Sequence, residues 1–237
     1  MHTPKPLLAL LLAASASMAQ AEPLKIGLIL PLTGPFASTG KQIEAGARLY
    51  MAQQGDTVAD RQVELIVKDD TGAPDMAKRI AQELVVNDKV SVLAGFGLTP
   101  LAMATAPIAT QSKTPLVVMA AATSSITEAS PYIVRTSFTV PQVVTTLADW
   151  ASANNIRKVV TLVTDYAPGV DSEKYFNQRF TTNGGVVVES LRVPLRSPDF
   201  APFLQKVRDA KPDALFTFVP SGVGAALRKQ FAERGLD

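Results

Sequence analysis

The strongest constraint on the fold is the regular alternation of short apolar segments with helical segments. The apolar segments are rich in Val, Ile and Leu, and we expect strands at 24–30, 63–67, 90–94, 116–119, 132–136, 159–163, 186–191 and 214–218. Helical periodicity lies between them, at 41–54, 74–86, 101–111, 142–153, 172–182, 200–210 and 222–234. This alternation predicts an α/β fold whose parallel sheets are covered on both faces.

The strand and helix series starts again near residues 138–141, where Pro141 precedes a new helix. A chain of 237 residues has room for two small domains. We therefore expect two Rossmann-like lobes, residues 22–140 and residues 141–237, joined by short crossovers.

The first 21 residues have the pattern of a cleavable export signal. Lys5 supplies a positive start, residues 7–14 are apolar, and Ala19-Gln20-Ala21 forms an A-x-A cleavage site. The apolar run is too short to span a bilayer. We expect secretion to the periplasm, and the absence of cysteine removes both disulfides and a site for lipid attachment.

Composition excludes several classes of function. The only histidine, His2, lies in the expected signal, so Ser-His-Asp catalysis and the usual zinc sites are excluded. The formal charge is +2 without a basic block, which argues against nucleic acid as a partner. The segment 34–42 departs from phosphate-loop spacing, and Pro100 stands where a dinucleotide fingerprint needs its third glycine. We expect a protein that is not an enzyme and has neither cofactor nor metal.

Polar residues near the ends of the expected strands mark a candidate binding site. Ligands of open α/β sheets bind beyond the carboxyl ends of the strands. Thr99 and Thr123 each open an expected helix there, and their hydroxyls could hold a carboxylate or cap the helices. For the adjacent carboxylates Asp69 and Asp70, hydrogen bonding within a loop or helix capping is favoured over metal binding.

Aromatic residues divide into two groups. Phe36 and Tyr166 lie in loops of the expected cleft, where each could face a ligand or pack its own loop. Trp150 lies on a predicted helix stripe and is expected in the core.

Several motifs together resemble a known family. They are LKIGLILPLTGPFASTG at 24–40, the Asp69-Asp70 strand end, DYAPGVD at 165–171 and SPDFAPF at 197–203. The chain is similar to type I periplasmic binding proteins, and within them to the branched-chain amino acid (Leu/Ile/Val) receptors of ABC importers. The resemblance implies a receptor that captures a small carboxylate between two lobes and delivers it to a membrane permease. We expect it to act as a monomer.

The resemblance also implies a set of site residues. Thr99, Thr123 and the backbone of Ala121 would hold the ligand carboxylate, and Thr39 would supply the contact from the first loop. Tyr166 would be the aromatic residue of the second lobe, with Pro168 as the alternative.

The resemblance leaves the ligand and the role open. Branched-chain amino acids and aromatic acids are both compatible with it. The acidic partner of a ligand ammonium would follow Asp237, and we expect the chain to be truncated at its C-terminus. A sensor of the same fold and an exported hydrolase are the alternative functions.

Overall fold

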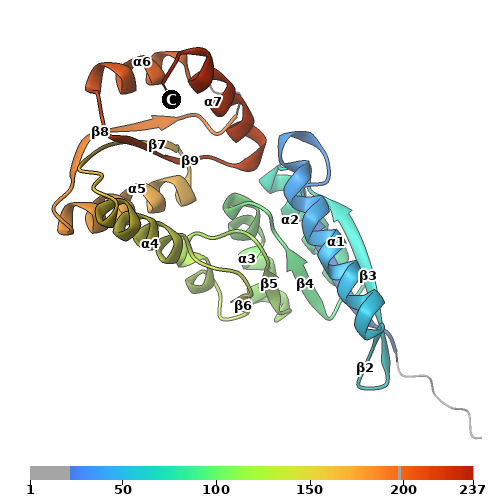
Figure 1. Ribbon diagram of the computed structural model, residues 1–237. Coiled ribbons are helices and arrows are strands. Elements are labelled where there is room, and N and C mark those ends of the chain that lie inside the picture. Colours follow the sequence, from blue (N-terminus) through green and yellow to red (C-terminus); the bar gives the residue numbers. More distant parts are fainter. Residues whose placement is uncertain (1–21, 197–198, 237) are drawn as a thin grey trace, which may run out of the picture.

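The computed structural model describes residues 22–196 and 199–236, so the expected export signal at 1–21 lies outside the described residues. Two separate sheets organise the chain (Figure 1). We call the first sheet and its helices lobe 1, and the second sheet and its helices lobe 2. Within the described residues, no helix is both long enough and apolar enough to cross a membrane.

Lobe 1 is built on a six-stranded sheet in the order β2-β3-β1-β4-β5-β6. Its strands are β1 (Leu24–Leu30), β2 (Thr57–Val58), β3 (Arg61–Asp69), β4 (Val92–Gly95), β5 (Leu116–Val118) and β6 (Ile133–Arg135). Its helices are α1 (Ala37–Gln54), α2 (Pro74–Val86) and α3 (Thr99–Ser112), with short 3-10 turns η1 (Gly34–Phe36) and η2 (Ser124–Glu128). All strand pairs are parallel except the antiparallel pairing of β2 with β3.

The strand β1 is buried on both faces, which gives lobe 1 two apolar layers. Ile29 packs into a cluster with Leu84 of α2 and Leu101 of α3. Its neighbours Leu28 and Leu30 point to the opposite face, where Ile43 of α1 packs against them. Side chains alternate along a strand, so each face of β1 anchors a different helix layer.

Lobe 2 has a three-stranded parallel sheet in the order β8-β7-β9. Its strands are β7 (Lys158–Thr164), β8 (Val186–Val193) and β9 (Ala214–Phe218). Its helices are α4 (Val140–Ala153), α5 (Ala167–Thr182), α6 (Ala201–Ala210) and α7 (Ser221–Glu233). Along β7, Val159 and Val163 pack towards α4 and α5, whereas Val160 and Leu162 pack towards α6 and α7.

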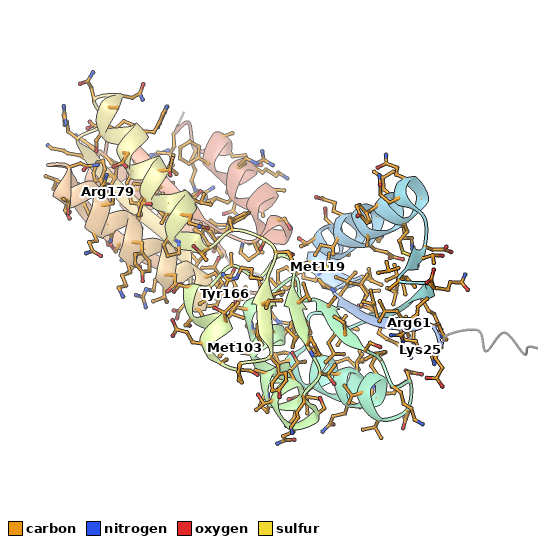
Figure 2. All side chains as sticks on the ribbon, turned by 90° about the horizontal axis from the view of Figure 1, so that it is seen from below. Lys25, Arg61, Met103, Met119, Tyr166 and Arg179 are labelled. Carbon is orange, nitrogen blue, oxygen red and sulfur yellow. The ribbon has the colours of Figure 1, made fainter. Side chains whose placement is uncertain are left out.

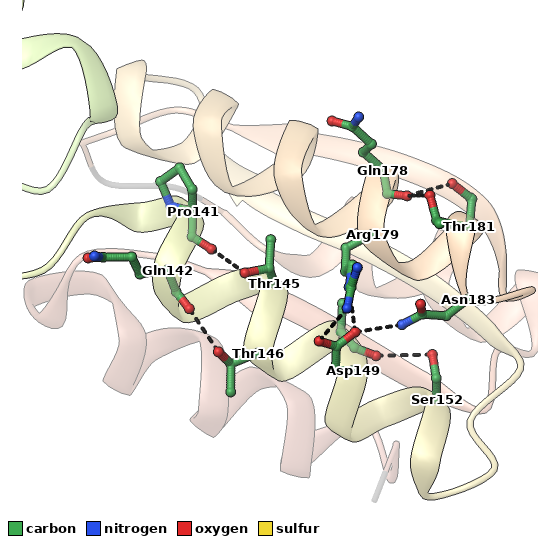
Figure 3. Close-up of polar contacts among 12 residues, drawn as sticks. Pro141, Gln142, Thr145, Thr146, Asp149, Ser152, Gln178, Arg179, Thr181 and Asn183 are labelled. Atoms are coloured by element: carbon green, nitrogen blue, oxygen red, sulfur yellow. Dashed lines mark hydrogen bonds and ion pairs between the residues drawn. The ribbon is translucent and has the colours of Figure 1, made fainter.

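The helices α4 and α5 are joined by a polar cluster at the surface (Figure 3). Arg179 of α5 donates from Nε and Nη2 to the two carboxylate oxygens of Asp149 on α4, at 2.6 and 3.0 Å. Asn183 donates to Asp149 Oδ1 at 2.7 Å. These bonds hold the pKa of Asp149 below its usual value.

The predicted architecture of two α/β lobes with parallel sheets is confirmed, and strands 24–30 and 214–218 have the predicted bounds. The short strand β2 was not predicted. The lobe boundary at residues 140 and 141 stays a prediction.

The expectation that Trp150 belongs to the core is wrong, since its exposure is 57%. The buried face of α4 carries Val144, Ala148 and Ala151 instead. The bulky residues Leu147 and Trp150 lie beside it, next to strand β9. The small residues of the buried face let α4 pack closely against α5, and the larger side chains lie outside that contact.

Candidate functional site

The loops that follow the strands of lobe 1 converge at the carboxyl edge of its sheet. The N–H of Phe96 donates to the carbonyl of Ile29 at 2.9 Å, and the N–H of Met119 donates to the carbonyl of Gly95 at 2.8 Å. The turn after β4 is therefore bonded to the end of β1 on one side and to the end of β5 on the other. These bonds bring the segment that opens α3 next to the segment that follows β5.

The two predicted hydroxyls meet at this edge. Thr99 Oγ1 and Thr123 Oγ1 lie 2.8 Å apart and hydrogen-bond to each other, and the two residues are 2% and 4% exposed. The alternative that they cap helices is wrong, because Leu98 precedes α3 as its cap and neither hydroxyl makes a capping bond. The pair is a buried set of neutral donors.

The backbone of Ala121 differs from its expected role in one respect. Its N–H donates to the carbonyl of Phe96 at 3.0 Å. That donor is already used within lobe 1, so the Ala121 N–H is engaged in this structure.

The first loop places Thr39 and Phe36 in different surroundings. Thr39 lies in the first turn of α1, and its hydroxyl is 3.1 Å from Ser221 Oγ of lobe 2. Phe36 is 2% exposed and packs in the core of lobe 1, against Gly72. The structure therefore favours loop packing for Phe36 and corrects the expectation that it faces a ligand.

Asp69 holds this first loop in place. It accepts hydrogen bonds from Leu32 N at 2.8 Å, Thr33 Oγ1 at 2.6 Å and Thr71 N at 2.8 Å. Partial burial acts to raise the pKa of Asp69, but these bonds outweigh it and lower the pKa below its usual value. The prediction of loop hydrogen bonding is confirmed.

Its neighbour Asp70 lies in a different environment. The side chain is fully buried, and Oδ1 accepts a hydrogen bond from Gly72 N at 2.8 Å. Burial raises the pKa of Asp70 to about 6. Across the described residues, no three His, Cys, Asp or Glu side chains gather in a group that could hold a metal ion.

Tyr166 lies between the two lobes at the start of α5 (Figure 2). Burial of its phenol raises the pKa of Tyr166 well above its usual value. The first turn of α5 passes so close to β7 that a Cβ at Gly169 would lie 1.8 Å from the carbonyl oxygen of Thr164. Glycine there allows this close approach just after Tyr166, whereas Pro168 is buried.

Several contacts join the lobes. Besides the Thr39 and Ser221 pair, a Cβ at Gly222 would lie 2.0 Å from the carbonyl oxygen of Pro35. Arg196 Nη2 donates to the carbonyl of Gly72 at 2.9 Å. Asp171 Oδ2 accepts from Ser124 N and from Ser124 Oγ, both at 2.8 Å. In the described structure the strand-end loops of the two lobes are therefore in direct contact.

Sequence reasoning placed these loops at the cleft but missed which of their residues pair. Ser221 and Ser124 are ordinary loop serines in the sequence, and neither has a neighbouring motif that marks it. Their roles depend on how the lobes meet, which a single sequence does not encode in a local pattern.

Two α/β lobes whose strand-end loops face one another define a bilobed ligand-binding protein. The chain matches the family described as "Periplasmic binding protein" over residues 23–237, and it belongs to this family. The family expected from the motifs is thereby confirmed.

A curated relative is the "Leu/Ile/Val-binding protein homolog 6" of Brucella melitensis. It is 46% identical over 224 residues, which cover 94% of this chain and 57% of the relative. The chain thus spans little more than half the length of the curated relatives that it matches.

Solved structures give the same result. A solute-binding protein of an ABC transporter from Rhodopseudomonas palustris BisB5, in complex with 3,4-dihydroxybenzoic acid, is 60% identical with a TM-score of 0.87, covering 90% of this chain and 59% of that one. A second from R. palustris, in complex with 4-hydroxybenzoate, is 42% identical with a TM-score of 0.87, covering 90% and 58%. A leucine-binding protein from Thermotoga maritima is 27% identical with a TM-score of 0.75, covering 82% and 55%.

Proposed function

We propose that this protein is the receptor of an ABC importer and binds a benzoate-type carboxylate between its lobes. The observation that carries the proposal is the buried pair of hydroxyls at the interlobe edge of lobe 1, Thr99 and Thr123. Buried hydroxyl donors suit an organic anion, because a hydrogen bond to a charged oxygen is stronger than one to a neutral oxygen.

The chemistry of binding follows from the geometry of this pair. In the described structure one hydroxyl donates to the other at 2.8 Å. A carboxylate replaces that neutral bond with two bonds to charged oxygens, each roughly twice as strong. Burial strengthens both bonds, because the local dielectric constant is low.

Two observations favour an aromatic acid as the ligand. The relatives crystallised with 3,4-dihydroxybenzoic acid and 4-hydroxybenzoate are 60% and 42% identical, against 27% for the leucine-binding protein. Tyr166 is half-buried and lies between the lobes. An aromatic ring can stack on or pack edge-on against another aromatic ring.

Export, lobe closure and docking on the permease are the other steps of the proposed function. Residues 1–21 direct export and are removed, and the protein works in the periplasm as a monomer. Ligand bound to lobe 1 favours the closed arrangement, because lobe 2 adds contacts that the open one lacks. The closed protein then docks on the permease and releases its ligand unchanged.

A thermal-shift screen of the whole protein without residues 1–21 tests the proposal. We expect 4-hydroxybenzoate and 3,4-dihydroxybenzoate to raise the melting temperature by mass action, and leucine, isoleucine and valine to leave it unchanged. Stabilisation by the amino acids alone would reject the aromatic ligand. Calorimetry on each positive compound then gives its affinity.

A further inference from the structure

The peptide bond between Thr123 and Ser124 directly follows the residue that carries one of the proposed ligand-binding hydroxyls. Its carbonyl accepts a hydrogen bond from Arg135 Nη2 at 2.8 Å. Its N–H donates to Asp171 Oδ2 at 2.8 Å. One peptide group is therefore held at both ends by side chains of opposite charge.

The two side chains come from different lobes. Arg135 is the last residue of β6 in lobe 1, whereas Asp171 lies in α5 of lobe 2. Asp171 also accepts from the Ser124 hydroxyl at 2.8 Å. The carbonyl end of the peptide is thus fixed within lobe 1, and the N–H end is fixed only when lobe 2 lies against it.

Arg135 and Asp171 form no direct ion pair with each other among the described residues. Two further nitrogens of Arg135, Nε and Nη1, are buried and have no hydrogen-bond partner among the described residues. Burial lowers the pKa of Arg135, and the negative charge of Asp171 acts in the opposite direction. The cation and the anion therefore act on the peptide from its two sides.

The orientation of this peptide group determines the direction in which the Thr123 side chain points. The plane between Thr123 and Ser124 sets the ψ angle of Thr123, which is 134°. That angle in turn orients the backbone from which the Thr123 hydroxyl projects towards Thr99. A backbone with only two soft dihedral angles per residue transmits such a constraint directly.

We propose that Arg135 and Asp171 are positioning residues that clamp the Thr123–Ser124 peptide and thereby couple lobe closure to carboxylate binding. The inference rests on the proposed function, because it assigns the clamp to the same pair of hydroxyls. Closure completes the clamp, and the clamped peptide holds the Thr123 hydroxyl in its binding orientation. Ligand and lobe 2 consequently favour the same loop conformation.

The test compares Asp171→Asn with wild type in the whole protein without residues 1–21. Loss of the carboxylate charge should weaken 4-hydroxybenzoate binding about tenfold, as expected for a hydrogen bond to a charged group. Asp209→Asn, on the exposed face of α6, makes the same charge change outside the site and should bind like wild type. Equal affinities of Asp171→Asn and wild type would overturn the inference.

A double-mutant cycle separates a clamp from two independent contacts. Arg135→Met should weaken binding, Arg135→Lys should restore part of it through a single donor, and Asp171→Asn should cost much less in the Arg135→Met background. Full additivity would contradict a shared peptide. If Arg135→Met does not fold, the Asp171 and Arg135→Lys variants still form the cycle.

Amide hydrogen exchange at Ser124 tests the clamp independently of which ligand the protein binds. We expect Asp171→Asn to speed this exchange roughly tenfold without any acid present. If the Ser124 amide is protected by Asp171 but the protein binds no benzoate, the proposed function is rejected and the clamp is retained. Benzoate binding with no such protection would reject the clamp and keep the function.

Discussion

Gly222 of lobe 2 lies so close to Pro35 of lobe 1 that the substitution Gly222→Ala tests how the lobes meet. A Cβ at position 222 would lie 2.0 Å from the carbonyl oxygen and 2.7 Å from the carbonyl carbon of Pro35. An ordinary contact is at least 3.4 Å, so Gly222→Ala must hold the lobes about 1.4 Å further apart at this point. The obstacle is backbone, which cannot rotate out of the way as a side chain can.

The cost should appear in closure and not in folding. Position 222 lies in the first turn of α7, where alanine suits a helix better than glycine does. Separation at this point breaks the 3.1 Å contact of Thr39 with Ser221 and loosens the packing around it. Losing one or two such contacts costs roughly 1–2 kcal/mol, which is about a 5- to 30-fold weaker affinity.

Calorimetry and small-angle scattering together check this expectation. We expect Gly222→Ala to bind 4-hydroxybenzoate more weakly, to scatter as a wider particle when the ligand is present, and to melt at or above the wild-type temperature when it is absent. The matched control is Gly224→Ala in the same helix, where a Cβ meets only a methyl group of Val219 at 3.6 Å. Wild-type affinity and wild-type compaction in Gly222→Ala would refute the reasoning.

Three further predictions concern single side chains. Thr99→Val and Thr123→Val should each weaken ligand binding by about 1.5–3 kcal/mol in calorimetry, with a combined effect smaller than the sum because the two hydroxyls bond to each other. Tyr166→Ala should weaken binding of hydroxybenzoates about tenfold or more while Tyr166→Phe keeps most of it, since the ring rather than the neutral phenol supplies the contact. The raised pKa of Asp70, about 6 against 3.8, means that the folded state disfavours its charge; this penalty is absent below pH 3.8 and grows as pH rises to about 6. Relative to wild type, Asp70→Asn should therefore gain about 2–3 kcal/mol of unfolding free energy between pH 4 and pH 7 in denaturant titrations, and a constant difference would contradict this.

The sequence predicted the elements well because their patterns are local. Strand β1 is a largely apolar segment followed by Pro31, and helix α2 starts with Pro74 and carries a regular apolar stripe at Ile80 and Leu84. Parallel pairing followed from the same composition. The two-residue strand β2 is too short to show any periodicity.

The candidate site could be predicted only in part. Thr99 and Thr123 were identified because each follows a strand and precedes a helical segment. The pairing of Ser124 with Asp171 spans 47 positions and depends on how two lobes meet. Phe36 shows the same limit, because a loop aromatic can point into either of two environments and only the packing around Gly72 decides between them.

Trp150 is the single tryptophan of the sequence, so indole emission from residues 1–237 reports on one place. That place is a shallow hollow lined by Ile156 and Ala214, at the end of the lobe 2 sheet where β7 and β9 begin. The loops of the cleft follow the opposite ends of these strands. Iodide quenching of this fluorophore should consequently follow the unfolding of lobe 2 while staying blind to a small acid entering between the lobes.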